Sequence, residues 1–137
     1  MTKVFISYRR QDREFAQWIK DALIPAGIDA RLDVWEPSPA ENVASAIRDE
    51  IQAADALVAI FSEAPNLGHI GLEIGMAVSL GKKVVAVPAP GSKPDPGLLG
   101  SIADAYVLDA ANRKPAELGA AIRTAVQGEH TENETPV

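Results

Sequence analysis

The sequence predicts an α/β protein built on an open parallel sheet of five strands with helices on both faces. Short apolar runs recur along the chain, and segments with apolar residues at helical spacing separate them, which is the alternation that produces a parallel sheet. The run Ala56–Phe61 is apolar, as expected of a central strand that is covered on both faces. The chain has 137 residues, of which 47% are hydrophobic, and this suits one domain with a substantial core.

Five segments are predicted as strands. In chain order they lie at residues 4–6, 28–34, 56–61, 83–87 and 105–108. The second alternates only weakly between polar and apolar residues, and the fifth has a weaker pattern than the first. Residues 88–97, between the fourth and fifth strands, contain four prolines and two glycines. We therefore expect a long loop there.

Helical spacing predicts four helices between and after these strands. The first begins at Asp12, a candidate N-cap, and stops at the Pro25-Ala26-Gly27 turn. The second begins at Ser38–Glu41, which has capping-box spacing with proline at the first helical position. The third lies within residues 67–81 and is apolar nearly all round, and the last covers residues 115–126.

The end of the chain differs in composition from the rest. The net charge is −6, and half of it comes from Glu129, Glu132 and Glu134. Residues 128–137 are polar throughout most of their length, so we expect a disordered acidic tail after a domain that spans residues 1–127.

Composition also excludes several classes of protein. An acidic chain lacks the electrostatic footprint of nucleic-acid binding. There is no cysteine and there are only two histidines, His69 and His130, so disulfides, thiolate sites and histidine-rich metal centres are excluded. No signal peptide or membrane span is predicted. We expect a cytoplasmic protein that has no nucleic-acid or membrane partner and needs no cofactor.

Polar residues follow the strands that would form the centre of the sheet. Five strands favour the flavodoxin-like order 2-1-3-4-5, in which ligands bind outside the carboxyl ends of strands 1 and 3. Ser7-Tyr8-Arg9-Arg10 follow the first strand, and Ser62 follows the third. The loop at residues 33–41, which contains Trp35, leaves the second strand at the same edge. We expect the ligand crevice to lie among these residues.

Glu73 is the only formal charge in the segment 67–81. A carboxylate on so apolar a helix should be buried, and it must then be paired, hydrogen-bonded or protonated. Two interpretations stay open: an active-site acid at the mouth of a pocket, or a structural glutamate held by an arginine or by backbone amides. Because the segment follows the third strand, Glu73 can face the crevice, which favours the first interpretation.

Several common kinds of active site lack support in the sequence. No glycine-rich turn follows the first strand, so neither a phosphate-binding loop nor a dinucleotide fingerprint is present. Ser62 has no nucleophile-elbow motif around it, and His69 alone is poor support for a serine hydrolase. A response regulator would need an acidic pair after the first strand, where this chain has Ser7 and Tyr8.

The segments VFISYRRQDREFAQWIKDAL, GIDARLDVW and ADALVAIFS resemble a bacterial Toll/interleukin receptor (TIR) domain over roughly residues 3–127. Phe5–Tyr8 is similar to the first box of that family, and residues 33–41 occupy the place of its BB loop. In TIR domains that cleave NAD, a glutamate on the helix after the third strand is catalytic, and by position this is Glu73. Many of them carry tryptophan four residues earlier, where this chain has His69.

The resemblance implies an NAD+ glycohydrolase or ADP-ribosyl cyclase, in bacterial immune-type signalling or NAD depletion, for which NAD+ is substrate and not cofactor. Glu73 would stabilise an oxocarbenium-like ribose, and Arg9 and Arg10 would hold the pyrophosphate. An aromatic ring could stack on a ring of the substrate, although Phe5 is more often a core residue. The further candidate contacts to the substrate are Phe5, Ser7, Tyr8, Trp35, Ser62 and His69.

Two other functions stay open. The chain could be a non-catalytic TIR interaction module that docks a second copy or another TIR domain through residues 33–41. The segment GLEIGMAVSLGKKVVAV is also similar to nucleoside deoxyribosyltransferases, which use a glutamate in an equivalent place. A nucleoside or nucleotide N-glycosidase or transferase is therefore the second alternative.

Overall fold

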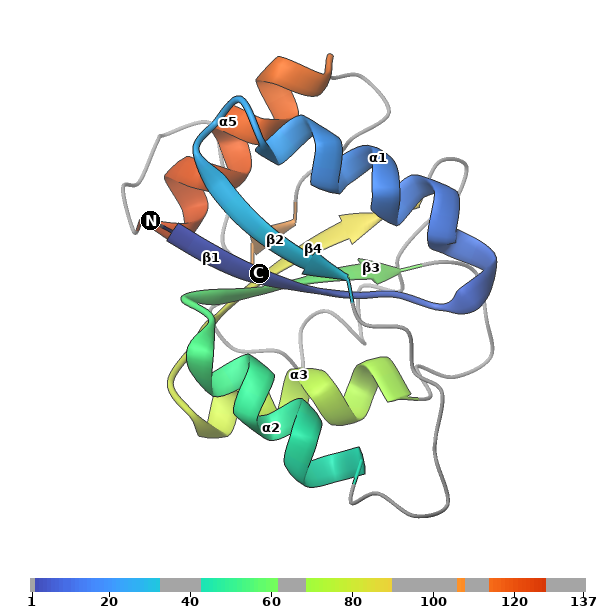
Figure 1. The fold of residues 1–137 in the computed structure, drawn as a ribbon, viewed down its shortest axis with the longest axis vertical. Coiled ribbons are helices and arrows are strands. Elements are labelled where there is room, and N and C mark those ends of the chain that lie inside the picture. Colours follow the sequence, from blue (N-terminus) through green and yellow to red (C-terminus); the bar gives the residue numbers. More distant parts are fainter. Residues whose placement is uncertain (1, 33–42, 62–68, 90–105, 108–113, 128–137) are drawn as a thin grey trace.

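The computed structural model describes residues 2–32, 43–61, 69–89, 106–107 and 114–127. These residues form a parallel sheet with helices on both faces (Figure 1). The strands are β1 (Thr2–Ser7), β2 (Ile28–Leu32), β3 (Ala56–Phe61), β4 (Lys83–Pro88) and β5 (Tyr106–Val107). The helices are α1 (Arg13–Leu23), α2 (Val43–Ala53), α3 (His69–Ser79) and α5 (Pro115–Val126), with a short 3-10 helix η1 (Arg10–Asp12) before α1.

The predicted parallel α/β fold is confirmed. The four longer strands lie in the order β2-β1-β3-β4, and the two-residue β5 pairs with β4 through Val85 and Tyr106. All six residues of β3 are buried, as predicted for a central strand, because β1 and β4 pair with its two edges and helices cover both of its faces. The predicted stop of the first helix is also found, since Gly27 has a φ of 76°, a conformation that glycine adopts without strain.

The alternation of side chains along β1 divides the interior into two cores. Val4 and Ile6 point toward α1 and α5, whereas Phe5 points toward α2 and α3, because successive residues of a strand face opposite sides of the sheet. The first core is completed by Ile19, Leu23, Leu118 and Ile122, and the second by Ile47, Ile51, Leu57, Ile74 and Ala77. Each helix is therefore held by the apolar stripe that it turns toward the sheet.

Helices α1 and α5 approach each other closely at Gly119. A Cβ atom at this position would collide with the carbonyl oxygen of Ala22 on α1. Glycine therefore permits the distance between these two helices, and the first core depends on it.

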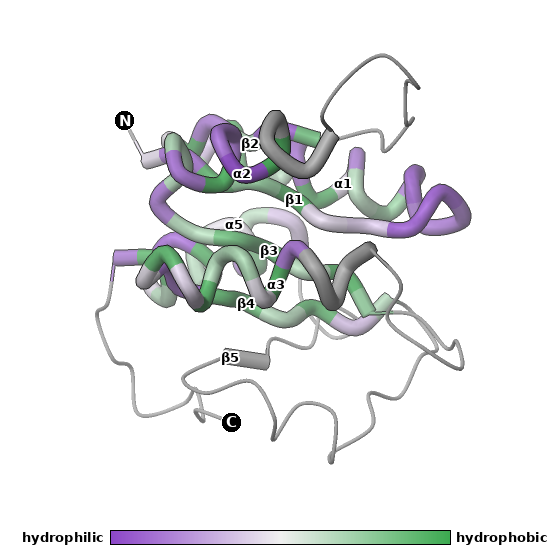
Figure 2. Tube along the Cα trace, turned by 90° about the horizontal axis from the view of Figure 1, so that it is seen from below, coloured by the Kyte–Doolittle hydropathy of each residue, from purple (hydrophilic) through white to green (hydrophobic). Residues whose placement is uncertain are grey.

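The carboxyl ends of the parallel strands lie at one edge of the sheet. Helices α1 and α3 both begin at this edge, on opposite faces (Figure 1). Figure 2 shows hydrophobic colouring along β3 and β4, and hydrophilic colouring in the turn that leads from β1 to α1. The carboxyl edge therefore combines a polar turn, between β1 and α1, with the apolar strands β3 and β4. Across the described ranges, no helix combines the length and the apolar character that crossing a membrane requires.

Candidate active site at the carboxyl edge of the sheet

Two polar residues are buried in the part of the chain that the structure describes, Ser7 and Glu73, each with 1% of its surface exposed. Ser7 is the last residue of β1, and Glu73 is in α3, the helix that follows β3. The predicted burial of the glutamate is confirmed. A buried charge costs several kcal/mol unless it is paired or hydrogen-bonded.

Ser7 and Glu73 lie on the same face of the sheet. Ser7 is two residues beyond Phe5, so its side chain points to the α2 and α3 side. Glu73 is three residues before Met76 and four before Ala77, which both pack into the core on that side. One stripe of α3 thus carries the carboxylate and two residues that contact the core.

Both residues also lie toward the carboxyl edge. Ser7 ends β1 and pairs with Ala59 of β3. Helix α3 starts at this edge and runs back along the sheet (Figure 1), so Glu73, in its first half, is near the same edge. The structure therefore brings the predicted catalytic residue and one predicted contact residue to the side and the edge where a ligand crevice was expected.

The hydroxyl of Ser7 is buried, and its Oγ has no hydrogen-bond partner within the described residues. Buried polar side chains are nearly always hydrogen-bonded, and an exception calls for a specific explanation. A substrate hydroxyl at the edge of the sheet would supply the missing partner of Ser7.

The two aromatic residues of β1 and the turn after it are packing residues. Tyr8 is 5% exposed and lies in the core with Val4 and Ile6, on the opposite face of the sheet from Ser7. Phe5 is 1% exposed and lies in the core beneath α2 and α3. The structure places Phe5 in the role that its strand position favours, which is core packing.

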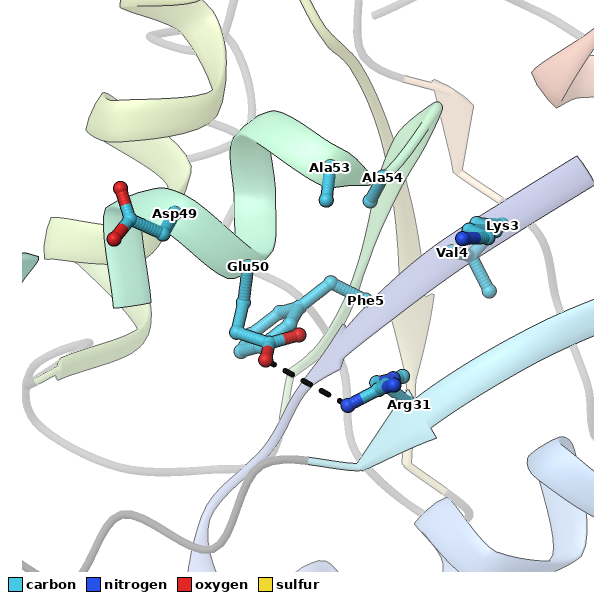
Figure 3. Close-up of a pocket in the computed structure, with 8 residues that line it drawn as sticks. All are labelled: Lys3, Val4, Phe5, Arg31, Asp49, Glu50, Ala53 and Ala54. Atoms are coloured by element: carbon cyan, nitrogen blue, oxygen red, sulfur yellow. Dashed lines mark ion pairs between the residues drawn. The ribbon is translucent and has the colours of Figure 1, made fainter. Parts of the chain in front are cut away.

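Phe5 also lines a small pocket under β2, with a volume of about 180 Å³ (Figure 3). The other residues that line it are Lys3, Val4, Arg31, Asp49, Glu50, Ala53 and Ala54. Arg31 and Glu50 form an ion pair across it at 3.6 Å, with side chains that are 69% and 46% exposed. So exposed a pair contributes little to stability. The pocket is lined by β1, β2 and the second half of α2, and not by the residues that follow the strands.

The two arginines lie in the turn after β1. Arg9 is half-buried, and its carbonyl oxygen accepts a hydrogen bond of 2.8 Å from the backbone N–H of Asp12. Arg10 is exposed. This turn is at the carboxyl edge, so the predicted contact of a guanidinium group with a phosphate is compatible with its position.

Asp12 is the N-cap residue of α1 that the sequence predicted, but its hydrogen bonding is unusual. Its side chain makes no capping hydrogen bond. Its Oδ2 is instead buried, without a hydrogen-bond partner among the described residues. The sequence predicted Asp12 as an N-cap and not as a site residue, because an aspartate before a helix has a sufficient local explanation.

Other candidates lie outside the described residues. These are Trp35 with the loop at 33–41, and Ser62. His69 is the first residue of α3, four positions before Glu73, and its side chain belongs to the same undescribed set. Over the described ranges, no three His, Cys, Asp or Glu side chains are grouped in a way that would hold a metal ion.

Three solved structures share the fold. A CMP N-glycosidase from Clostridium botulinum, BcmB, is 19% identical with a TM-score of 0.63, over 89% of this chain and 98% of that one. A 2-deoxyribosyltransferase from Bacillus psychrosaccharolyticus is 16% identical with a TM-score of 0.60, over 85% and 96%. A chain of the RPS4 and RRS1 TIR domain heterodimer is 15% identical with a TM-score of 0.66, over 95% and 99%.

At the level of sequence, one family is matched. The family model described as TIR domain matches residues 4–125. No curated protein matches the chain significantly.

Proposed function

The chain belongs to the TIR domain family, and from this premise we propose that it cleaves the bond between nicotinamide and ribose in NAD+, with Glu73 as the catalytic carboxylate. The observation that carries the proposal is the burial of Glu73, 1% exposed, on the helix that starts at the carboxyl edge of the sheet. Two proteins with this fold, the CMP N-glycosidase and the 2-deoxyribosyltransferase, are named for N-glycosidic chemistry. The likeness in fold to these two proteins supports the cleavage of an N-glycosidic bond.

The chemistry of NAD+ suits a site with one carboxylate. The nicotinamide ring is cationic, so when the C1′–N bond breaks, both electrons go to nitrogen and the base leaves as a neutral molecule. No proton has to be donated to it. The ribose develops oxocarbenium character at C1′, and the fixed negative charge of Glu73 stabilises that charge where water is excluded.

The second half of the reaction determines the product. Water that attacks C1′ gives linear ADP-ribose and releases a proton to solvent. Attack by a nitrogen of the adenine in the same molecule gives a cyclic product instead. Ser7, on the same face of the sheet as Glu73, would contact a hydroxyl of the reacting ribose. Arg9, in the turn at the edge, would bind the pyrophosphate.

A nucleotide N-glycosidase is the second candidate, because one of the structural neighbours is a CMP N-glycosidase. Cytosine is neutral in CMP and would leave as an anion, so its departure is assisted by an acid that donates a proton. Among the described residues, Glu73 is the one buried charged side chain. A single carboxylate can stabilise the developing ribose cation when the base leaves without needing a proton, as nicotinamide does, and we therefore favour NAD+.

The experiment is a comparison of the two substrates. Purified protein is incubated with NAD+ and, separately, with CMP, and the products are separated by chromatography. We expect release of nicotinamide and no release of cytosine. Release of cytosine alone would identify a nucleotide N-glycosidase. If neither is cleaved and light scattering shows self-association, the chain is a non-catalytic TIR module that docks through residues 33–41, and the neighbour described as a TIR domain heterodimer makes this a reasonable alternative.

A further inference from the structure

The carboxylate of Asp12 is in an unexpected environment. An aspartate at the N-cap of a helix normally accepts a hydrogen bond from a backbone N–H in the first turn. Asp12 precedes α1, but no such bond forms. Its Oδ2 is buried and makes no hydrogen bond to any described residue. This oxygen thus makes neither the capping hydrogen bond nor another one within the described residues.

A second group in the same segment of chain shows the same deficit. The Oγ of Ser7, a residue with 1% exposure, also has no hydrogen-bond partner in the described ranges. Ser7 ends β1 and Asp12 ends the turn that follows, so both belong to one segment at the carboxyl edge. Parallel α/β sheets bind ligands at this edge. Two unsatisfied groups in one such segment are explained by a ligand that bonds to both.

The chemistry of a carboxylate restricts what Asp12 can bind. An ionised carboxylate only accepts hydrogen bonds, so its ligand must donate them, and a phosphate group would be repelled. The neighbouring hydroxyls of a ribose are two donors side by side, and an acidic residue binds a ribose hydroxyl in dinucleotide-binding folds. The sugar of a nucleotide therefore fits Asp12 better than its phosphates do.

Asp12 and Glu73 belong to two helices that begin at the same edge of the sheet, which allows one ligand to contact both. Asp12 precedes α1, and Glu73 is in the first half of α3, and these helices begin at the same edge on opposite faces of the sheet (Figure 1). A dinucleotide has two riboses joined by a pyrophosphate. One ribose would lie at Glu73, the other at Asp12, and Arg9, in the turn before Asp12, would meet the pyrophosphate.

We propose that Asp12 is a substrate-binding residue that accepts hydrogen bonds from the second ribose of a dinucleotide, the ribose whose bonds do not break. This inference rests on the proposed function, because it assigns the other ribose to Glu73. It deepens that function by assigning a residue that binds the ribose remote from the bond that breaks. Nicotinamide mononucleotide contains the same scissile bond and leaving group but only one ribose, so it cannot reach both carboxylates.

The test compares NAD+ with nicotinamide mononucleotide on wild type, Asp12→Asn and Glu14→Gln. Asparagine is also a good N-cap, so the first substitution should leave α1 intact. Glu14 is an exposed acid in the first turn of the same helix, and its substitution removes an equal charge from the helix N-terminus. We expect Asp12→Asn to lower kcat/KM about tenfold for NAD+, mainly through KM, and to leave the mononucleotide unchanged. Glu14→Gln should change neither.

A binding measurement separates this inference from the proposed function. Calorimetry with ADP-ribose, which contains both riboses and no bond to nicotinamide, should show binding that Asp12→Asn weakens about tenfold. If wild type cleaves nothing and this weakening is still seen, the proposed function is wrong and the role of Asp12 stands. Equal losses on both nucleotides, kinetics of Asp12→Asn identical to wild type, or no binding of ADP-ribose would each overturn the inference.

Discussion

The two faces of the sheet differ in what they bury. The face covered by α1 and α5 packs apolar side chains and brings the two helices together at Gly119, where no Cβ fits. The face covered by α2 and α3 contains Ser7 and Glu73 within its apolar core. Polar groups in a core reduce its contribution to stability, and functional sites are where proteins accept such a loss. Both faces therefore carry an apolar core, and the proposed chemistry belongs to the second.

The largest effect should come from Glu73→Gln, which keeps the shape of the side chain and removes its charge. We expect cleavage of NAD+ to fall by about a hundredfold or more, because the charge that stabilises the transition state is lost. The melting temperature should stay within about 3 °C of wild type or rise, since a buried carboxylate is seldom stabilising. Initial rates and thermal melts measure the two quantities.

The matched control for this substitution is Glu50→Gln on α2, whose side chain is 46% exposed. It should change neither the rate nor the melting temperature appreciably. A folded Glu73→Gln protein with full turnover would remove Glu73 from the mechanism. If that protein is instead unfolded, the glutamate is a structural residue held by its neighbours.

The next effect concerns the opposite face. Gly119→Ala places a methyl group against the carbonyl of Ala22, so α1 and α5 must move apart. Overpacking of this kind costs about 1–3 kcal/mol, which corresponds to a fall in melting temperature of roughly 3–10 °C. Gly75→Ala on α3 is the control, because nothing lies within 4 Å of its Cβ position, and alanine there should stabilise the helix by up to about 1 kcal/mol.

Thermal or urea denaturation of the two glycine variants sharpens the comparison. The same glycine-to-alanine change is made on a helix of each face, and we expect Gly119→Ala to lower the stability and Gly75→Ala to raise it. A Gly119→Ala protein as stable as wild type would show that the approach of α1 and α5 is not what holds the first core together.

The smallest effect is expected for Ser7→Ala. A neutral hydrogen bond to substrate contributes about 0.5–1.5 kcal/mol, so kcat/KM for NAD+ should fall roughly three- to tenfold. The melting temperature should not fall, since the hydroxyl that is removed has no partner among the described residues. Ser79→Ala is the control, because the Ser79 hydroxyl donates to the carbonyl of Met76 at 2.8 Å on the exposed side of α3. A less stable Ser7→Ala protein with unchanged kinetics would make Ser7 structural.

The periodicity of the sequence predicted those features that depend on a single helix or strand. The apolar run Ala56–Phe61 predicted a central strand, and all of its residues are buried. The apolar character of residues 67–81 predicted that Glu73 would be buried, and it is. These predictions hold because the spacing of side chains along a regular backbone sets which of them can reach the core.

The identity of the residues around Glu73 was predicted less well, since neighbours in sequence need not be neighbours in space. Ser7 and Tyr8 were both predicted to contact the substrate, but consecutive residues at a strand end point to opposite faces, and only Ser7 shares the face of Glu73. The hydrogen bonding of Asp12 could not be predicted from its N-cap position, because the packing of the turn against the sheet decides where its side chain points.

The sequence by itself determined the parallel α/β fold, the order of the four longer strands and the burial of one glutamate, because these follow from local pattern and from the way parallel strands connect. Only the tertiary structure decided that Gly119 must remain a glycine, that Tyr8 belongs to the core beneath α1 and α5, and that the N-cap side chain of Asp12 makes no capping hydrogen bond. Each of these depends on contact between segments far apart in the chain or on the competition of one side chain for several partners. Such contacts leave no periodic trace in a single sequence.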